Sequence, residues 1–403
     1  MEFDRYTVRR IRHRDGRTSW WIFGPDGEVH RAALTVLVRY GTSTQQTYAY
    51  SLADHLNWLR ANHRTPATVT FDDLRRYMNG LTGQVDGVFG AVWRRPEQKR
   101  VLGASAAANV ATVVKAFYLS LQASDGVGQD VVAALTGSGS LTRRGRSSTE
   151  SNPLAPRASS RRPRFLPDEV VAALFEPGVL TTARDVMIVT WLHDGGFRVG
   201  GLCGLRFCDL HLTRHHPCGQ RADPHVHVVG RDDNPNEARA KSYVPLDPSR
   251  DGCIVDGVVR AVSDDMVSTY YAYLLDEFGS VQRLVDHEQV LVHLRGVTPG
   301  AALRTAGVRK MLDRACRRAG LNVRVLPHSF RHKAAAALYA ESDFNAELTA
   351  QEFGWSNPSM VTDVYGKSAN REAMKFLKQA WEATARPAAE AYLSLDSASG
   401  DTV

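Results

Sequence analysis

The sequence predicts a mainly α-helical protein of two domains, the second of which contains a small antiparallel β-sheet. Apolar residues recur at helical spacing over residues 43–137 and again from residue 165 onward. Between these regions, "RRGRSSTESNPLAPRASSRRPR" (143–164) has no periodicity and is rich in Ser, Pro and Arg, as expected of a flexible basic linker. Two β-prone runs, "HVHVVG" (225–230) and "KSYVPL" (241–246), interrupt the second helical region.

Length and composition fit a globular protein of two or three domains with separate cores. The chain has 403 residues, of which 43% are hydrophobic. No apolar run reaches the ~20 residues of a membrane helix. The charged start, "MEFDRYTVRR", is unlike a signal peptide, and the five cysteines form no regular framework. We therefore expect a cytoplasmic protein with reduced thiols.

The charge balance favours a polyanionic partner. Net charge is +7 and the pI is about 9.2. Only 8 of the 50 basic residues are lysine. The rest are arginine, whose planar guanidinium can donate two parallel hydrogen bonds to phosphate oxygens. High-GC coding would produce the same bias, so composition by itself does not identify nucleic acid as the partner.

Five segments follow from this organisation. Residues 1–35 are expected to form an N-terminal β-hairpin, because two Asp-Gly turns flank β-prone runs. Its many arginines fit either an accessory DNA arm or a solvated edge hairpin. The others are a helical domain (36–140), the linker (141–164), a second domain (165–385) and a tail (386–403).

Helices are expected in both domains from periodicity and capping residues. In the first they are 43–63, 70–81, 103–124 and 129–137, with a basic loop at 92–100. In the second they are 167–176, 181–195, 199–206, 262–279, 302–319, 328–341, 345–353 and 370–384.

The stretch "LPHSFRH" (326–332) contains the most informative pair. Proline is tolerated in the first turn of a helix, and residues three apart share a helix face, so His328 and Arg331 point the same way. A helix N-terminus carries partial positive charge and attracts anions. The sequence therefore predicts an anion site at this point.

Three further motifs occur in a fixed order around this pair. Arg198 lies in "GGFRVGGLCGLRFCDL", Lys241 in "ARAKSYVPL", and Trp355 and Tyr365 in "FGWSNPSMVTDVYGKS". In this order, the set resembles the tyrosine recombinases, or phage-integrase family. The first arginine also has the family's setting, with Gly196, Leu202, Leu205 and Asp209 in the expected places.

The resemblance implies a fold and a partner. The fold would be a SAM-like helical core-binding domain plus an integrase-type catalytic domain, which together form a clamp on double-stranded DNA. Family members assemble on DNA, so a homotetramer with a dimer on each recombination site is expected. Accessory DNA-bending proteins and association with the nucleoid are compatible with this expectation.

The resemblance also implies roles for six residues. Tyr365 would be the nucleophile that forms a 3′-phosphotyrosine, and Arg198 and Arg331 would hold the phosphate. Lys241 would protonate the leaving 5′-oxygen, although Arg239 lies in the same loop. His328 would help to activate the tyrosine, and Trp355 would donate its indole N–H. This chemistry needs no metal, cofactor or ATP, and His332 is expected only to support the site.

Two departures from the family pattern are visible. The acidic residue expected three places after Arg198 is Gly201, and the interval from Trp355 to Tyr365 is one residue longer, which could mean a bulge before the nucleophile. Neither removes a reacting group. We therefore expect a site-specific recombinase of integrase or transposase type, carried by a mobile element. The alternatives are a type IB topoisomerase-like nicking-closing enzyme and a catalytically idle DNA-binding regulator.

The run of cysteines and histidines over 203–227 is a candidate metal site. It contains no C-x-x-C pair, whereas structural zinc sites typically use tight paired spacings. No metal site is expected from this spacing.

Overall fold

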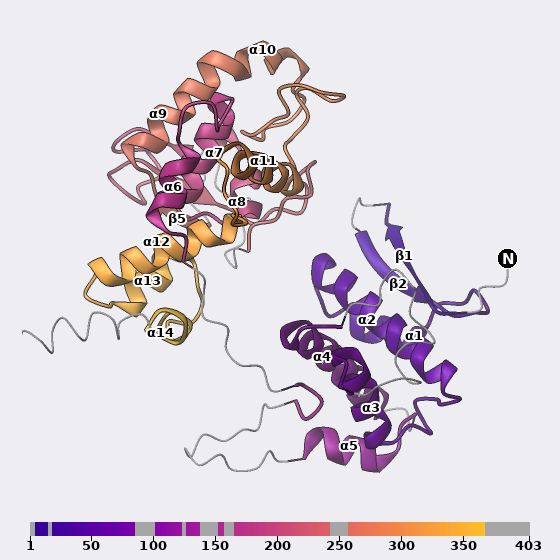
Figure 1. The fold of residues 1–403 in the computed structure, drawn as a ribbon. Helices are drawn as coiled ribbons and strands as arrows, with labels where there is room; N and C mark the ends of the chain where they lie inside the picture. Colours follow the sequence, from indigo (N-terminus) through magenta and orange to yellow (C-terminus); the bar gives the residue numbers. More distant parts are fainter. Residues whose placement is uncertain are drawn as a thin grey trace, which may run out of the picture. The chain divides into compact units, whose positions relative to one another are not determined.

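The chain folds into two compact units, Met1–Ser160 and Arg161–Val403, each with a hydrophobic core. The computed structural model describes residues 5–14, 18–84, 101–122, 126–137, 152–156, 165–241 and 257–366 (Figure 1). Several expected segments lie outside these ranges: the loop 92–100, most of the linker, most of the strand at 241–246, the helix 370–384 and the tail. Within the expected linker, Leu154 is 4% exposed and packs into the core of the first unit.

The expected hairpin is present and shares the core of the first unit. Strands β1 (Thr7–Arg12) and β2 (Thr18–Phe23) pair antiparallel. Ile22 is buried, and the Trp20 N–H donates to Gln45 Oε1 at 2.7 Å. The hairpin is thus fixed to the helix that carries Gln45 (Figure 1).

The described part of the first unit also contains five helices. They are α1 (Arg31–Leu37), α2 (Thr42–Ala61), α3 (Phe71–Thr82), α4 (Ala104–Leu121) and α5 (Gln129–Thr136). Helices α2 to α5 match the four expected ones, while α1 was not expected. A capping box of Thr70 and Asp73 begins α3, which explains its sharp start.

Helix α4 lies at the centre of this unit. Its length and apolar composition alone would allow it to cross a membrane. In the structure it packs against α1, α2, α3 and α5, and it buries Val113, Val114 and Phe117. Its apolar character is therefore accounted for by its place in the core.

The second unit surrounds a three-stranded antiparallel sheet with helices. The strands are β3 (Leu210–His211), β4 (His225–Val228) and β5 (Val258–Ala261), in the order β3-β4-β5. The helices before the sheet are α6 (Asp168–Leu174), α7 (Ala183–His193) and α8 (Val199–Gly204). Those after it are α9 (Asp264–Tyr273), α10 (Gly279–Val281), α11 (Thr305–Arg318), α12 (Pro327–Glu341), α13 (Ala346–Phe353) and α14 (Ser359–Tyr365).

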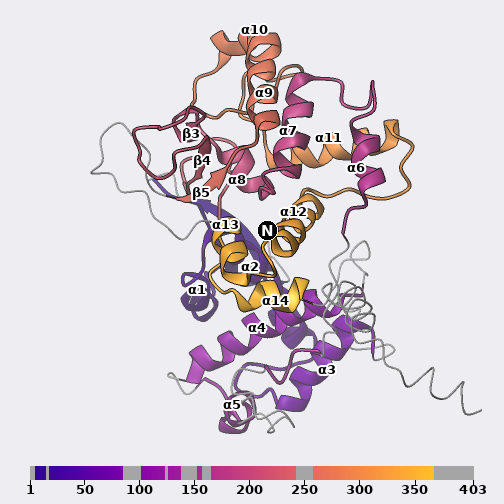
Figure 2. The ribbon, with the colours of Figure 1, turned by 90° about the vertical axis from the view of Figure 1, so that its left-hand side faces the viewer.

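The last three helices form a small cluster of their own. Helix α13 packs against both α12 and α14, and Tyr339, Phe353 and Val361 are buried between them (Figure 2). Gly354 ends α13 with φ of 60°, a left-handed conformation that glycine adopts without strain. This turn directs the chain towards Trp355 and then into α14. Neither α14 nor β5 was expected from the sequence.

Candidate active site

Four cationic side chains converge on one small cavity of the second unit. Arg198, Lys241, Arg260 and Arg331 line it, from the start of α8, the end of the described 165–241 range, β5 and α12. Phe197, Gly201, Val228, Ala240, Val258 and Phe353 complete the lining. None of the described residues that line this cavity carries a carboxylate, so its charge favours an anion.

Arg331 is buried at the first turns of α12, with 3% of its surface exposed. Its Nη1 donates to the Gly196 carbonyl at 3.0 Å, and its Nη2 donates to the Phe353 carbonyl. The guanidinium lies over the rings of Phe353 and Trp355, with Cζ at 5.0 and 4.9 Å from the ring centroids. Within the described part of the chain its Nε finds no hydrogen-bond partner. One buried donor therefore remains to be satisfied.

A glycine makes this contact possible. Gly196 has φ of 56°, and a Cβ at this position would lie 2.6 Å from Phe353 Cε1. Only glycine allows the backbone to approach so closely. Its carbonyl then accepts from Arg331, two residues before Arg198 begins α8.

The charges in this region act on one another. Burial, followed by the positive charges of Arg198 and Arg260, lowers the pKa of Arg331 to about 8. Partial burial and the charges of Arg331, Arg198 and Lys241 lower the pKa of His328. A bound anion would relieve this repulsion.

Tyr365 is the last residue of α14 and is 2% exposed. Its hydroxyl forms a hydrogen bond of 2.8 Å with His332 Nδ1, and its ring centroid lies 6.0 Å from that of Trp355. Burial raises the pKa of Tyr365 to about 12, although the charge of Arg331 opposes the shift. The phenol is therefore neutral in this conformation.

His332 is the group that contacts this hydroxyl. Burial and the neighbouring His328 and Arg331 lower the pKa of His332 to about 4. Its imidazole is thus neutral at pH 7, and the ring of His328 packs edge-on to it at 4.2 Å. The six residues selected from the sequence all lie in this region of the second unit, but the tyrosine bonds to His332 and not to His328.

Comparison with protein families matches residues 260–372 to the model described as "Phage integrase family". The match contains His328, Arg331, Trp355 and Tyr365, in the order noted above. The second unit, termed the integrase domain, is thus similar to the phage integrase family over residues 260–372. Arg198 and Lys241 precede the matched part of this integrase domain, and the cavity joins them to Arg331.

Transposase A from transposon Tn554 of Staphylococcus aureus is similar to part of this chain. It is 26% identical over 184 residues, which are 46% of this chain and 44% of the transposase. The chain therefore matches less than half the length of that curated relative.

Solved structures share the fold. The XerH site-specific recombinase, bound to its palindromic difH substrate, has a TM-score of 0.52 and 14% identity, over 85% of this chain and 80% of that one. The Tn1549 transposon integrase, in complex with transposon right end DNA, has a TM-score of 0.52 and 15% identity, over 86% of this chain and 98% of that one. The likeness thus extends beyond the integrase domain.

Two residues of the integrase domain have a place in the site that the sequence did not indicate. His332 was expected only to support the site, yet it holds the Tyr365 hydroxyl. Arg260 was not considered, yet it is 4% exposed and lines the cationic cavity. Adjacency to Arg331 was the available signal for His332; no sequence signal identified Arg260, since β5 itself was not expected.

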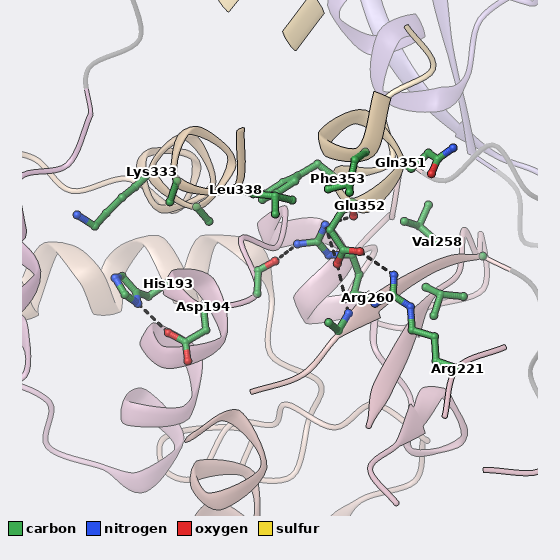
Figure 3. Close-up of a pocket in the computed structure, with 17 residues that line it drawn as sticks. His193, Asp194, Arg221, Val258, Arg260, Lys333, Leu338, Gln351, Glu352 and Phe353 are labelled. Atoms are coloured by element: carbon green, nitrogen blue, oxygen red, sulfur yellow. Dashed lines mark hydrogen bonds and ion pairs between the residues drawn. The ribbon is translucent and has the colours of Figure 1, made fainter. Parts of the chain in front are cut away.

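Arg260 also borders a larger cavity of about 980 Å³ (Figure 3). Its guanidinium donates to the Gly195 and Glu352 carbonyls and lies 3.7 Å from the Glu352 carboxylate. Arg221 forms a second ion pair with Glu352 at 2.7 Å. Glu352 therefore links the connection between β3 and β4 to α13 and to β5.

The two departures from the family pattern have structural counterparts in the integrase domain. Gly201 lies in α8 against β4, where a Cβ would contact Val228 Cγ1 at 3.0 Å. A side chain at this position would press on Val228, which would have to move by a few tenths of an ångström. The longer interval before Tyr365 contains the turn at 356–358, after which α14 runs without a bulge to the tyrosine.

Proposed function

We propose that this protein is a site-specific DNA recombinase of the integrase or transposase type. It would cut and rejoin DNA through a covalent bond between a 3′-phosphate and Tyr365. The convergence of Arg198, Lys241 and Arg331 on a cavity without a described carboxylate, beside Tyr365, carries the proposal. Similarity to a transposase and to DNA-bound recombinases supports it.

In the first chemical step, the phosphate occupies the cationic cavity. Arg198 and Arg331 would donate to its non-bridging oxygens, with the unsatisfied Nε of Arg331 among the donors. The bound phosphate would satisfy the buried Nε–H donor of Arg331 and would also reduce the repulsion between the guanidiniums. Phosphoryl transfer depends mainly on such positioning and charge stabilisation.

Tyr365 then attacks the phosphorus. The bond from the phenolic oxygen to phosphorus forms as the bond from phosphorus to the 5′-oxygen breaks. His332, neutral and bonded to the hydroxyl, would accept the phenolic proton. Lys241 would give a proton to the departing 5′-oxygen. Trp355 would pack beside the phosphate, and His328 would polarise it. A free 5′-hydroxyl can later reverse the step, so neither ATP nor a metal ion enters it.

The buried nucleophile belongs to a resting state. Tyr365 has 2% of its surface exposed, so its hydroxyl cannot meet a DNA phosphate without movement of α14. We propose that DNA binding, with the two units closing as a clamp on the duplex, releases it. Assembly of two protomers on each site, and of four when two sites pair, would complete the reaction. Such a protein would work on nucleoid DNA.

Covalent capture tests the proposal. A nicked duplex from DNA flanking the gene, in which a short 5′ fragment diffuses away after cleavage, would trap the intermediate. Three proteins are compared: the wild type, Tyr365→Phe and the control Tyr271→Phe, which alters an exposed tyrosine of the same unit. We expect an adduct that survives denaturation with the wild type and the control, and no adduct with Tyr365→Phe.

Other results would contradict the proposal in distinct ways. An adduct that persists in Tyr365→Phe would mean that another residue is the nucleophile. Tight binding of DNA known to contain the site, without an adduct from any protein, would favour the idle regulator. Relaxation of supercoiled plasmids without exchange between two sites would favour the topoisomerase-like alternative.

A further inference from the structure

Four potential metal ligands meet at one edge of the sheet in the second unit. His211 ends β3, His225 and His227 lie on β4, and Cys218 belongs to the connection between these strands. His211 pairs with His225 across the two strands, and alternate residues of a strand share a face. The three imidazoles therefore face the same way, and Cys218 reaches them from the connection.

The ligand atoms are close together. One atom from each of the four residues lies within 4.8 Å of all the others. His211 Nδ1, His225 Nε2 and Cys218 Sγ are separated from one another by 3.1 to 3.2 Å. Tetrahedral zinc bonds of 2.0–2.3 Å place ligand atoms about 3.3–3.6 Å apart. The cluster is thus near the geometry that an ion would require.

Hydrogen positions in the cluster leave lone pairs facing one another. His211 Nε2 lies 3.3 Å from the Cys208 carbonyl, and His225 Nδ1 lies 2.8 Å from the Asp223 carbonyl. Because a carbonyl only accepts, both of these nitrogens carry the hydrogen. The neutral rings then present bare His211 Nδ1 and His225 Nε2 at 3.2 Å, which cannot bond to each other.

The cluster has too few hydrogens for its members to form hydrogen bonds with one another. Among the three close pairs, only the Cys218 thiol has a hydrogen to share. Metal-binding histidines commonly donate their second ring N–H to a backbone carbonyl, as both rings do in this cluster.

We propose that His211, Cys218, His225 and His227 bind a structural zinc ion. Three imidazole nitrogens and one thiolate suit zinc, which favours tetrahedral nitrogen and sulfur ligands. On binding, the Cys218 thiol gives up its proton to solvent and the sulfur bonds to the metal. His216 is not a ligand: it stacks on His211 at 3.6 Å, and its Nδ1 accepts from the Cys218 N–H.

The ion would fix the long connection between β3 and β4. Cys218 holds the middle of this connection, and Arg221, three residues later, pairs with Glu352 on α13. Glu352 also contacts Arg260, which lines the cationic cavity. The metal would thereby stabilise the ion pairs that support the candidate active site, and it would not itself contact DNA.

The test measures metal content in the full chain, purified without a polyhistidine tag from zinc-containing medium. We compare the wild type with Cys218→Ala and with the control Cys208→Ala. Cys218 is half-buried in a connection and Cys208 is exposed, so both variants should fold. We expect about one zinc per chain in the wild type and the control, and less than a tenth of this in Cys218→Ala.

Two further measurements separate a site from a folding defect. Cobalt added to metal-free wild type should give tetrahedral d–d bands and a thiolate charge-transfer band, which Cys218→Ala should lack. A chelator should lower the Tm of the wild type but not of Cys218→Ala. Equal zinc in Cys218→Ala and wild type, or wild type that binds neither zinc nor cobalt, would overturn the proposal. These readouts require no DNA cleavage, so they are independent of the proposed recombinase activity.

Discussion

Single residues of the second unit depend on partners that lie far away in the sequence. Tyr365 is neutral because it is buried, and its hydroxyl forms a hydrogen bond with His332 on another helix. Arg331 is fixed by two backbone carbonyls, one in the α7–α8 turn and one at the last residue of α13. The chemistry of each group is therefore set by the fold around it.

Replacing His332 tests its role as proton acceptor. We expect His332→Ala to slow single-turnover DNA cleavage about a hundredfold, the lower range for loss of a general base. DNA affinity should stay unchanged, because His332 bonds to the tyrosine. Added imidazole should restore part of the rate by entering the vacated space. Full activity in His332→Ala, or a loss that imidazole cannot rescue, would contradict this role.

His55 should make the first unit sensitive to acid. It is fully buried with Nε2 at 2.8 Å from the Tyr118 hydroxyl, and burial lowers its pKa to about 3. The unfolded chain, with a histidine pKa near 6.5, binds the proton more readily. The stabilisation is therefore present above pH 6.5 and is lost as the pH falls towards 3.

Urea denaturation at several pH values measures this effect. Between pH 7 and pH 5, His55 should lower the free energy of unfolding by about 2 kcal/mol. In His55→Gln, which retains a polar partner for Tyr118, this part of the pH dependence should disappear. An unchanged pH profile in the variant would assign the acid sensitivity elsewhere.

At the scale of elements, the long periodic helices were predictable, as were the short helices α6 and α8, whereas α1, α14 and β5 were not. Helices α2, α4 and α12 follow from apolar spacing, with Pro327 marking the start of α12. Helices α1 and α14 span seven residues each and β5 spans four, and the spacing of apolar residues did not reveal them. They form because neighbouring elements cover their apolar residues.

The candidate site, too, was predictable from the sequence only in part. Arg198, Lys241, His328, Arg331, Trp355 and Tyr365 were selected from motif order, and the structure gathers them. Which histidine contacts Tyr365 depends on how α14 packs on α12, and sequence spacing does not contain that information. The histidine–cysteine cluster was discounted because its spacing is loose, but strand pairing brings its members together.

The turn between α13 and α14 should be sensitive to a single methyl group. At Gly354, with φ of 60°, a Cβ would lie 2.9 Å from Val258 Cγ2. Gly320 has φ of 64° with nothing within 4 Å of the same position, so it serves as a matched control. We expect Gly320→Ala to lower the free energy of unfolding by about 1 kcal/mol. Gly354→Ala should lower it by about 2 kcal/mol more, from overpacking.

Denaturation of both variants, with the wild type as reference, measures the difference. Gly354→Ala should also reduce DNA cleavage, because the same turn positions Trp355 beside Arg331. Equal losses of stability in the two variants would show that the contact with Val258 is relieved without cost.

For the whole molecule, two features matter: separate cores in the two units and an excess of positive charge. The first core includes the hairpin and α1 to α5, and the second includes the sheet and α6 to α11. Net charge is +7, which suits a partner with a phosphate backbone. Composition favoured a polyanionic partner, but it neither identified nucleic acid nor placed the contacts.

Salt should therefore control DNA affinity. If the protein neutralises six or more phosphates, affinity for a nonspecific duplex should fall about a thousandfold between 50 and 200 mM salt. Arg198→Ala should reduce the slope of log affinity against log salt by about one contact. Fluorescence anisotropy at several salt concentrations measures both. A slope near zero would contradict a binding mode based on phosphate contacts.

The burial of Tyr365 separates recognition from reaction. On the proposed mechanism, molecules with an accessible tyrosine would be a minor population of the free protein, and the apparent affinity for a cleavable complex would be reduced by that fraction. Looser packing of α14 would raise this population, and it would make the protein more reactive and less discriminating at once. Fidelity towards a target would then depend on how much binding free energy a sequence supplies for opening, as well as on the bases that are read.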